Sequence, residues 1–262
     1  MTRVVSLFLP SWPTDRLRRQ AGDAAPPVEA PLVLVGREGS RRVVRATDAA
    51  ARTAGLRIGM PVAKAQVLVP CLIVRDADPA ADARGLERLA LWLLQRVAPI
   101  VATDPPDGLV IDSTGADHLH GGEQALLDAL VGRLTMSGVA ACAAVADTRG
   151  AAHALARHAA RPTLVASPGH GASVLTPLPL GALRLPEAMA SDLRLLGFER
   201  IGDLLVQPRA PLVRRFGPEL GRRSRRAGRG QCPGQPTPLS GARAGMRPTA
   251  RSGTSLATGA AR

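Results

Sequence analysis

The acidic residues between positions 104 and 115 are the first candidates for chemistry. Asp104 and Asp107 precede the apolar run Leu109-Val110-Ile111, and Asp112 follows it before Ser113-Thr114-Gly115. The run predicts a short buried strand that presents carboxylates at a cleft. Carboxylates arranged in this way can hold two divalent ions about 3.5–4 Å apart for phosphoryl transfer. Such a site needs about three acidic groups, so the rest of the chain must supply what this strand lacks.

His118 and His120, in the sequence DHLHGG, are the second candidates. On a strand, residues two apart share a face, so the pair could bind a metal ion with Asp117 nearby. No third ligand stands in register with them. A loop without a metal ion is therefore the favoured interpretation.

Composition places the chain among globular proteins with a basic C-terminal end. Hydrophobic residues make up 45% of the 262 residues, which is enough for a substantial core. The net charge is +13, and nine arginines follow Glu219 with no acid among them, which leaves +4 for residues 1–221. Charge therefore permits nucleic acid as a partner without requiring it.

Cysteine usage and hydropathy favour a soluble, cytoplasmic protein. Cys71, Cys142 and Cys232 are far apart and form no C-x-x-C pair, so neither a disulfide framework nor a zinc site is predicted. The apolar run near the N-terminus is broken by Pro10, and no segment reaches the ~20 apolar residues of a membrane span. We expect no membrane association.

Hydrophobic periodicity predicts an alternating α/β region up to about residue 166. Strands are expected at 3–9, 32–35, 43–44, 72–74, 100–102, 109–111, 139–146 and 163–165. Helices are expected at 15–19, 46–55, from about 60 to 69, and at 80–97, 122–135 and 150–160. This order predicts one mixed sheet with helices on one face and a small subdomain inserted over residues 13–75.

Residues 177–220 change character. The stretch LRLLGFERIGDLLVQP predicts helices at 185–196 and 199–206 joined by the hairpin Leu196-Gly197-Phe198. The backbone N–H groups of such a hairpin and the start of the second helix, which contains Gly202, can hold a phosphate oxygen without recognising base sequence. An ordinary helix pair with a glycine cap is the alternative.

From Ser224 onward the sequence is rich in Arg, Gly and Pro and has almost no aliphatic periodicity. This composition predicts a disordered tail over residues 224–262. Because the change falls within a helical pattern, we entertain the hypothesis that the tail is a truncated or out-of-frame end.

The order of these pieces resembles the Y-family, translesion-type DNA polymerases over about residues 3–223. The resemblance rests on VVSLFLPSWPTDRL, RATDAAARTAGLRIGMPVAKAQVLVPCL, DGLVIDSTG, ARP at 160–162 and LLGFERIGDLL. It implies an α/β (α+β) fold with a palm over residues 1–12 and 76–166, a fingers-like insertion over 13–75 and a helix-hairpin-helix thumb over 167–223.

The same resemblance implies that the catalytic carboxylates are mostly lost. The family's first strand has the form H-I-D-x-D-x-F, and the overlay puts Phe8 and Pro10 at the two acidic positions. The motif D-E-A-Y-L-D-x-T-G overlays DGLVIDSTG with Asp107 at the acid and Gly108 at the catalytic glutamate. Magnesium needs an octahedral oxygen shell, so one aspartate cannot fix two ions. We predict a vestigial active site, no metal ion, no other cofactor and no polymerase activity.

Two arginines retain the family's basic positions. The fingers pattern Y-x-A-R becomes Ala49 to Arg52, and the basic residue before proline in the palm is Arg161. The resemblance implies that Arg52 and Arg161 bind a nucleotide or a phosphate, and ordinary surface arginines are the alternative.

This degenerate pattern resembles the ImuB-type branch of the family, found in bacterial mutasomes. It implies a non-catalytic DNA-binding accessory protein of translesion synthesis and DNA damage repair, with a separate error-prone polymerase, the sliding clamp and a RecA-like subunit as partners. Partner contacts in that type lie largely in a C-terminal region that this sequence lacks, which puts them in question. The alternatives are an active lesion-bypass polymerase that holds Mg²⁺ through Asp104, Asp107 and Asp112, or an inactive truncated fragment.

Overall fold

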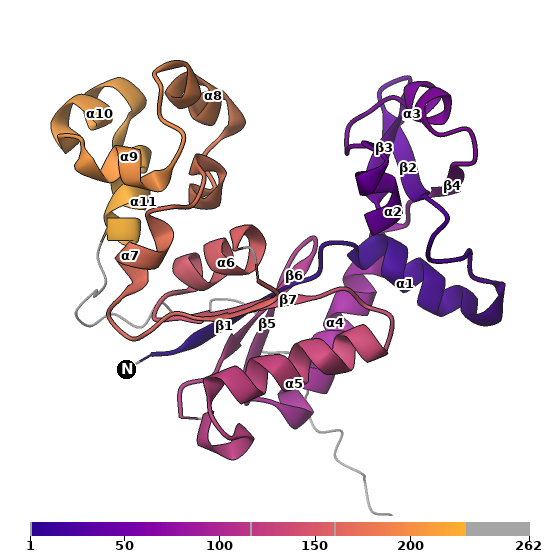
Figure 1. Cartoon of the computed structure of the whole chain (residues 1–262), viewed down its shortest axis with the longest axis horizontal. Coiled ribbons are helices and arrows are strands. Elements are labelled where there is room, and N and C mark those ends of the chain that lie inside the picture. The colour runs from indigo at the N-terminus through magenta and orange to yellow at the C-terminus, as the bar shows by residue number, and fades with distance from the viewer. Residues whose placement is uncertain (1, 116, 160, 229–262) are drawn as a thin grey trace, which may run out of the picture.

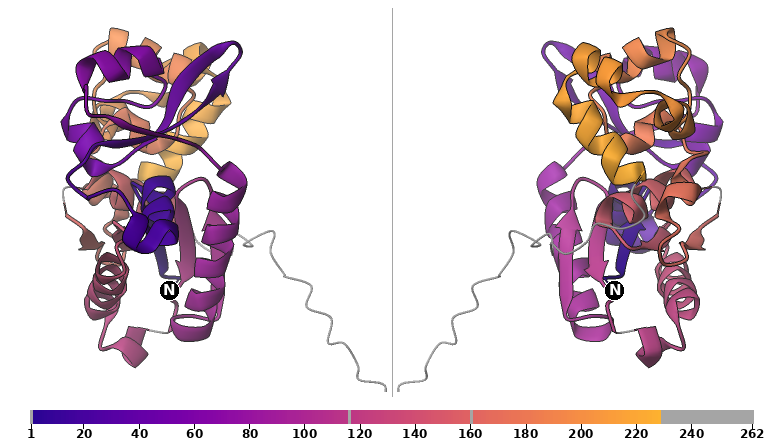
Figure 2. Two further views of the ribbon diagram at one scale, coloured as in Figure 1. Left: turned by 90° about the vertical axis from the view of Figure 1, so that its right-hand side faces the viewer. Right: turned by 90° about the vertical axis from the view of Figure 1, so that its left-hand side faces the viewer.

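The computed structural model describes residues 2–115, 117–159 and 161–228, and Figure 1 shows how they are arranged. A central five-stranded sheet with its helices forms the body of the molecule. A small lobe, made of β2 to β4 with α2 and α3, stands at one end of the body, and a helical lobe, made of α7 to α11, stands at the other. Both views of Figure 2 place the two lobes on the same side of the body.

The central sheet has the strand order β5-β6-β1-β7-β8. Its middle strand, β1 (Val4–Phe8), pairs antiparallel with β6 (Gly108–Asp112) and with β7 (Cys142–Ala146). At the two edges, β5 (Ile100–Asp104) is antiparallel to β6 and β8 (Thr163–Val165) is parallel to β7. The sheet is therefore mixed, as the sequence predicts.

Helices cover both faces of this sheet, so the prediction of helices on one face is wrong. Val5 and Leu7 of β1 pack toward α4 (Pro79–Arg96) and α5 (Glu123–Met136). The other face, to which Phe8 belongs, packs against α6 (Arg149–His158). The run VVSLFL is apolar on both faces, which is typical of a strand buried on both sides.

The small lobe is built on a three-stranded sheet of order β3-β2-β4. The strands predicted at 32–35 and 43–44 are confirmed and form a hairpin of β2 (Leu32–Glu38) and β3 (Arg41–Thr47), while β4 (Ile73–Asp76) pairs in parallel with β2. The short helices α2 (Ala49–Thr53) and α3 (Val62–Leu68) pack on this sheet. Asp48 caps α2 by accepting a hydrogen bond from the backbone N–H of Ala51 (2.7 Å).

Helix α1 (Trp12–Ala21) connects the body to the small lobe and begins earlier than predicted. The helix starts at Trp12 with Pro13 in its first turn, where a missing N–H costs nothing. The indole Nε1 of Trp12 donates to the carbonyl of Asp82 in α4 (3.0 Å). A Cβ atom at Gly85 would lie 2.7 Å from the Trp12 ring, so a glycine is required for this close approach. The short helix η1 (Gly22–Ala24) follows.

The helical lobe contains α7 (Gly171–Leu175), η3 (Leu180–Leu183), α8 (Glu187–Leu195), α9 (Ile201–Val206), α10 (Arg209–Phe216) and α11 (Pro218–Gly228). The predicted pair of helices around Gly197 is confirmed as α8 and α9. The prediction that order ends before Ser224 is wrong at its boundary, because α11 continues to Gly228; residues 229–262 of the predicted tail lie outside the described residues. Among the described helices, none is long and apolar enough to cross a membrane.

The buried carboxyl of Asp15 generates a prediction about stability. Burial raises its pKa from 3.8 to about 6, although the backbone N–H of Ala140 donates to it (2.9 Å). Between about pH 4 and pH 6 the folded state therefore binds more protons than the unfolded state, so this group makes the protein less stable as pH rises through that range. The rise in pKa corresponds to about 3 kcal/mol above pH 6.

We expect Asp15→Asn, which keeps an acceptor for Ala140, to remove this penalty. The melting temperature of the variant relative to the unaltered protein should rise between about pH 4 and about pH 8. Thermal unfolding followed by tryptophan fluorescence measures the difference. A difference independent of pH would contradict the assignment.

Candidate active-site remnant and hairpin

Three of the residues predicted for a vestigial active site meet at one end of the central sheet. Phe8 at the end of β1 lies directly opposite Gly108 at the start of β6. Asp107 immediately precedes Gly108, and its carbonyl accepts a hydrogen bond from the backbone N–H of Leu9 (2.8 Å). Asp104 ends β5 opposite Gly108, so it joins the same end of the sheet.

The guanidinium of Arg157, which comes from α6, fills the space beside these residues. It lies over the ring of Phe8, with 4.6 Å between Cζ and the ring centroid, and its Nη2 donates to Oδ1 of Asp107 (2.6 Å). A Cβ atom at Gly108 would lie 2.9 Å from the same Nη2. A cation is therefore held at this end of the sheet by an aromatic face and a carboxylate.

Asp104 is the centre of a buried charge cluster. Its carboxylate accepts one hydrogen bond from Arg149 of α6 and one from Arg184, each 2.9 Å long, and Arg157 lies 3.9 Å away. Burial raises the pKa of this carboxyl, but the positive charges of Arg184 and Arg149 outweigh burial and hold the pKa below its ordinary value. Asp104 is thus ionised, and each of its carboxylate oxygens accepts a hydrogen bond from an arginine.

His153 belongs to the same cluster as a neutral ring. Burial, with the charges of Arg157 and Arg184, lowers its pKa to about 3. Its Nε2 accepts a hydrogen bond from Nε of Arg184 (3.0 Å), so Nδ1 carries the proton. In the described part of the chain, Nδ1 of His153, Nη1 of Arg157 and Oγ of Ser6 are buried without a hydrogen-bond partner.

This arrangement does not fit a pair of divalent ions. Phe8 and Gly108 offer no side-chain oxygen, and the carboxylates of Asp104 and Asp107 are bound to arginines. Asp112 lies at the opposite end of β6, where its side chain caps the turn by accepting a hydrogen bond from the backbone N–H of Thr114 (3.0 Å). The three aspartates of the alternative metal site therefore do not converge.

The two histidines do not form a metal site either. They lie in the short helix η2 (Asp117–His120), and the ring of His120 lies 3.2 Å from the carbonyl of Val97. Within the described ranges, no three His, Cys, Asp or Glu side chains gather in a way that could hold a metal ion.

The structure separates the two arginines predicted to bind phosphate. Arg52 is hydrogen-bonded to the carbonyls of Pro10 (3.0 Å) and Thr47 (2.8 Å) and to Oγ of Ser11 (2.7 Å), so it ties the small lobe to the end of β1. Arg161 is exposed and precedes β8, whose Thr163 lies beside Ala143 in β7. That register puts Arg161 near the Phe8 end of the sheet. Phosphate binding by either residue stays a prediction.

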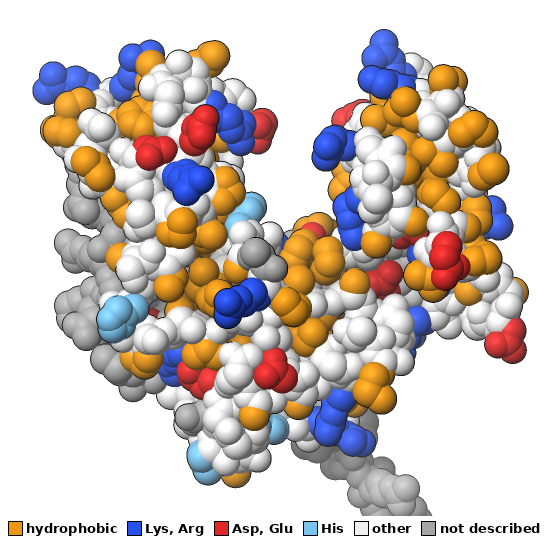
Figure 3. Space-filling view, viewed as in Figure 1, with side chains coloured by type: hydrophobic (Ala, Val, Ile, Leu, Met, Phe, Trp, Pro, Cys, Tyr) orange, Lys and Arg blue, Asp and Glu red, His pale blue; other side chains and the backbone are white. Residues whose placement is uncertain are grey.

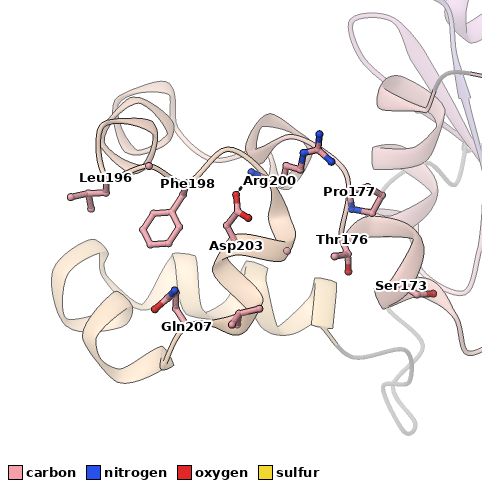
Figure 4. A pocket seen from close by; sticks show the side chains of 11 residues that line it. Ser173, Thr176, Pro177, Leu196, Phe198, Arg200, Asp203 and Gln207 are labelled. Carbon is pink, nitrogen blue, oxygen red and sulfur yellow. Dashed lines mark hydrogen bonds between the residues drawn. The ribbon is translucent and has the colours of Figure 1, made fainter.

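The helix-hairpin-helix lines an open pocket of about 820 Å³ in the helical lobe. Leu196 and Phe198 flank Gly197, whose φ of 86° is favourable only for glycine. Figure 4 shows Asp203 pointing back to the start of its own helix, where it accepts from the backbone N–H groups of Glu199 (2.9 Å) and Arg200 (2.8 Å). These bonds hold the pKa of Asp203 below its usual value.

The backbone donors of this hairpin are already used within the protein. The N–H groups of Gly197 and Phe198 donate to carbonyls of α8, and that of Gly202 donates to Thr176 (2.9 Å). A Cβ atom at Gly202 would lie 2.7 Å from Cγ2 of Thr176, so packing explains this glycine. Binding of a phosphate by backbone N–H groups would require some of these bonds to exchange.

Sequence reasoning missed the arginine and histidine side chains that surround Asp104. Arg149, His153 and Arg157 are spaced four residues apart within the predicted helix 150–160 and its flank, so they share one helical face. That spacing was an available signal, although it does not reveal which strand the face meets. Arg184 carries no comparable signal.

Comparison with known proteins places these features in a family. A model of the impB/mucB/samB family matches residues 23–157. The chain is 50% identical over 164 residues to Protein ImuB from Caulobacter vibrioides strain NA1000 / CB15N, and the match covers 62% of this chain and 35% of that protein. It is 26% identical over 193 residues to DNA polymerase IV from Dehalococcoides mccartyi strain CBDB1, which covers 72% and 49%.

Solved structures share the fold at lower identity. DinB from Sulfolobus solfataricus superimposes with a TM-score of 0.68 at 18% identity, covering 86% of this chain and 66% of that chain. An insertion ternary complex of Dbh DNA polymerase gives 0.65 at 19% identity, covering 86% and 67%. The mixed α/β fold is thus that of the Y-family DNA polymerases. The chain spans about a third of the length of the ImuB protein it matches and about half that of the polymerase. Because the family model covers more than half of its residues, the chain belongs to the impB/mucB/samB family.

Proposed function

We propose that this chain is the non-catalytic, DNA-binding part of an accessory protein of translesion synthesis. The observation that carries the proposal is the guanidinium of Arg157, held over Phe8 and bonded to Asp107. Arginine stays protonated at every physiological pH, so it is a permanent cation at the end of the sheet. The protein thus places the positive charge of Arg157 where the resemblance predicts carboxylates and divalent ions.

The donor set supports the absence of two-metal chemistry. A divalent ion at this place would have to displace Arg157 from Asp107 and would find no side-chain oxygen at positions 8 and 108. Two-metal phosphoryl transfer requires both ions to be fixed relative to the reacting phosphate. We infer that the chain needs no Mg²⁺ and extends no primer.

The relatives support a role in DNA damage tolerance. The 50% identity to an ImuB protein favours an accessory role, and polymerase complexes among the structures of the same fold favour DNA as the ligand. A separate error-prone polymerase, the sliding clamp and a RecA-like subunit are proposed partners of the whole protein. The aligned region covers 35% of that relative, so these partners are proposed for the whole protein and not for this region alone.

A hollow between the two lobes is the proposed DNA path. Figure 3 shows the hollow above the body of the molecule. The side chain of Arg149 is about half exposed (47%), and Arg161 is exposed at the same end of the sheet. Arginines of this kind bind the phosphate backbone without base specificity.

An active polymerase is the second candidate, because Asp104 and Asp107 both approach the Phe8 end of the sheet. Primer extension on a primer–template with Mg²⁺ or Mn²⁺ and all four nucleotides discriminates the two. We expect no extension by the unaltered chain and none by Asp107→Ala, with both proteins retaining DNA binding. Extension that disappears in Asp107→Ala would establish catalysis and sink the accessory assignment.

The contact between Gly108 and Arg157 gives a stability prediction. Gly108→Ala should destabilise the fold by about 1–3 kcal/mol, because its Cβ would be forced against the guanidinium and the Leu7 carbonyl. Gly132→Ala is the matched control, since a Cβ there meets no atom within 4 Å. In an Arg157→Ala background the cost of Gly108→Ala should shrink. Equal costs in both backgrounds, measured by urea unfolding, would contradict a filled site.

Salt dependence tests the phosphate contact of Arg161. The logarithm of DNA affinity falls linearly with the logarithm of salt concentration, and Arg161→Ala should reduce that slope by about 1. Arg42→Ala is the control, because Arg42 is engaged with Asp76 in the small lobe (2.9 Å). A slope that is the same for Arg161→Ala and the unaltered chain would remove Arg161 from the interface.

A further inference from the structure

Arg184 lies in the helical lobe and contacts the body of the molecule. It follows η3 and precedes α8, and among the described residues it is the one non-glycine residue with a positive φ (55°). The left-handed conformation costs roughly 1–2 kcal/mol for a residue with a Cβ. A backbone outlier of this kind persists only where surrounding contacts hold it.

The side chain of Arg184 holds two elements of the body at once. Its Nη2 donates to Oδ2 of Asp104 at the end of β5 (2.9 Å), and its Nε donates to Nε2 of His153 in α6 (3.0 Å). Both acceptors are buried, while the side chain of Arg184 is 46% exposed, so the two bonds are partly buried. Hydrogen bonds to an ionised group are the stronger class, and Asp104 provides one here.

The backbone of Arg184 is held from the other side by the helical lobe. Arg223 of α11 donates to the carbonyls of Leu183 (2.9 Å) and Arg184, and its guanidinium also pairs with Glu219 (2.6 Å). Arg184 is therefore fixed between the sheet body on its side-chain side and α11 on its backbone side.

Apolar contacts alone do not define how the lobe is oriented. Leu175, Leu178 and Ile201 of the lobe share a core with the alanine-rich face of α6. The hydrophobic effect is non-directional, so this core brings the lobe and the body together but tolerates small rotations. The charged hydrogen bonds of Arg184 are directional and restrict those rotations.

We propose that Arg184 is a positioning residue that fixes the orientation of the helical lobe on the sheet body and thereby sets the width of the hollow between the lobes. Its effect on DNA affinity rests on the proposed function; its effect on lobe orientation does not.

Distance measurements between spin labels test the orientation directly. Labels at Met136→Cys in α5 and Val206→Cys in α9 are suitable because these side chains are 89% and 84% exposed, and the three native cysteines are replaced by serine. Arg184→Gly and Arg184→Asn both suit a positive φ and remove the long side chain. Arg194→Ala is the control, since Arg194 pairs with Glu187 within the lobe (3.0 Å).

We expect one narrow distance distribution in the otherwise unaltered chain and in Arg194→Ala, and a broad one in both Arg184 variants at similar melting temperature. An unchanged distribution in folded Arg184→Gly would overturn the proposal.

DNA affinity should fall about tenfold in the Arg184 variants, with an unchanged slope of the logarithm of affinity against the logarithm of salt concentration. A salt slope lowered by about 1 with an unchanged distribution would instead make Arg184 a phosphate contact and overturn the positioning role. Absence of DNA binding by the unaltered chain would defeat the proposed function while leaving the distance result decisive for orientation.

Discussion

The contact of the Arg157 guanidinium with Phe8 and Asp107 is the interaction on which the end of the central sheet depends. Phe8 supplies a flat face and Asp107 a counter-charge, so the cation is held 4.6 Å from the ring centroid in a largely buried place. Gly108 is compatible with this arrangement because a larger residue would collide with the guanidinium. The residues at positions 8 and 108, where the resemblance expects carboxylates, are therefore coupled through Arg157.

A second layer of charge surrounds this contact and extends it to the helical lobe. Asp104 accepts hydrogen bonds from Arg149 of α6 and from Arg184 of the helical lobe, and neutral His153 accepts one from Arg184. The carboxylate of Asp104 is buried, whereas the side chains of Arg149 and Arg184 are about half exposed. Asp104 therefore links this end of the central sheet to the helical lobe.

The sequence predicted most of the elements but not the partners of the buried charges. Apolar periodicity located the strands and helices because it depends on local spacing, and the turn chemistry of Asp112 and Gly197 followed from residue type. The start of α1 was missed because Pro13 in a first turn resembles a loop, and the second helical face of the sheet was missed because burial on both sides of β1 does not show which helix covers each. Contacts such as Arg157 with Phe8 join residues 149 positions apart, and no local pattern encodes them.

The central claim is that a protein side chain takes the place of divalent ions at the end of the sheet. Titration of Mn²⁺ against the purified chain, followed by the loss of the free-ion electron paramagnetic resonance signal, tests this claim most directly when the unaltered chain and Asp107→Asn are compared. We predict that the two proteins bind Mn²⁺ equally weakly, because Asp107 is already neutralised by Arg157. A Mn²⁺ site in the unaltered chain that disappears in Asp107→Asn would contradict the account.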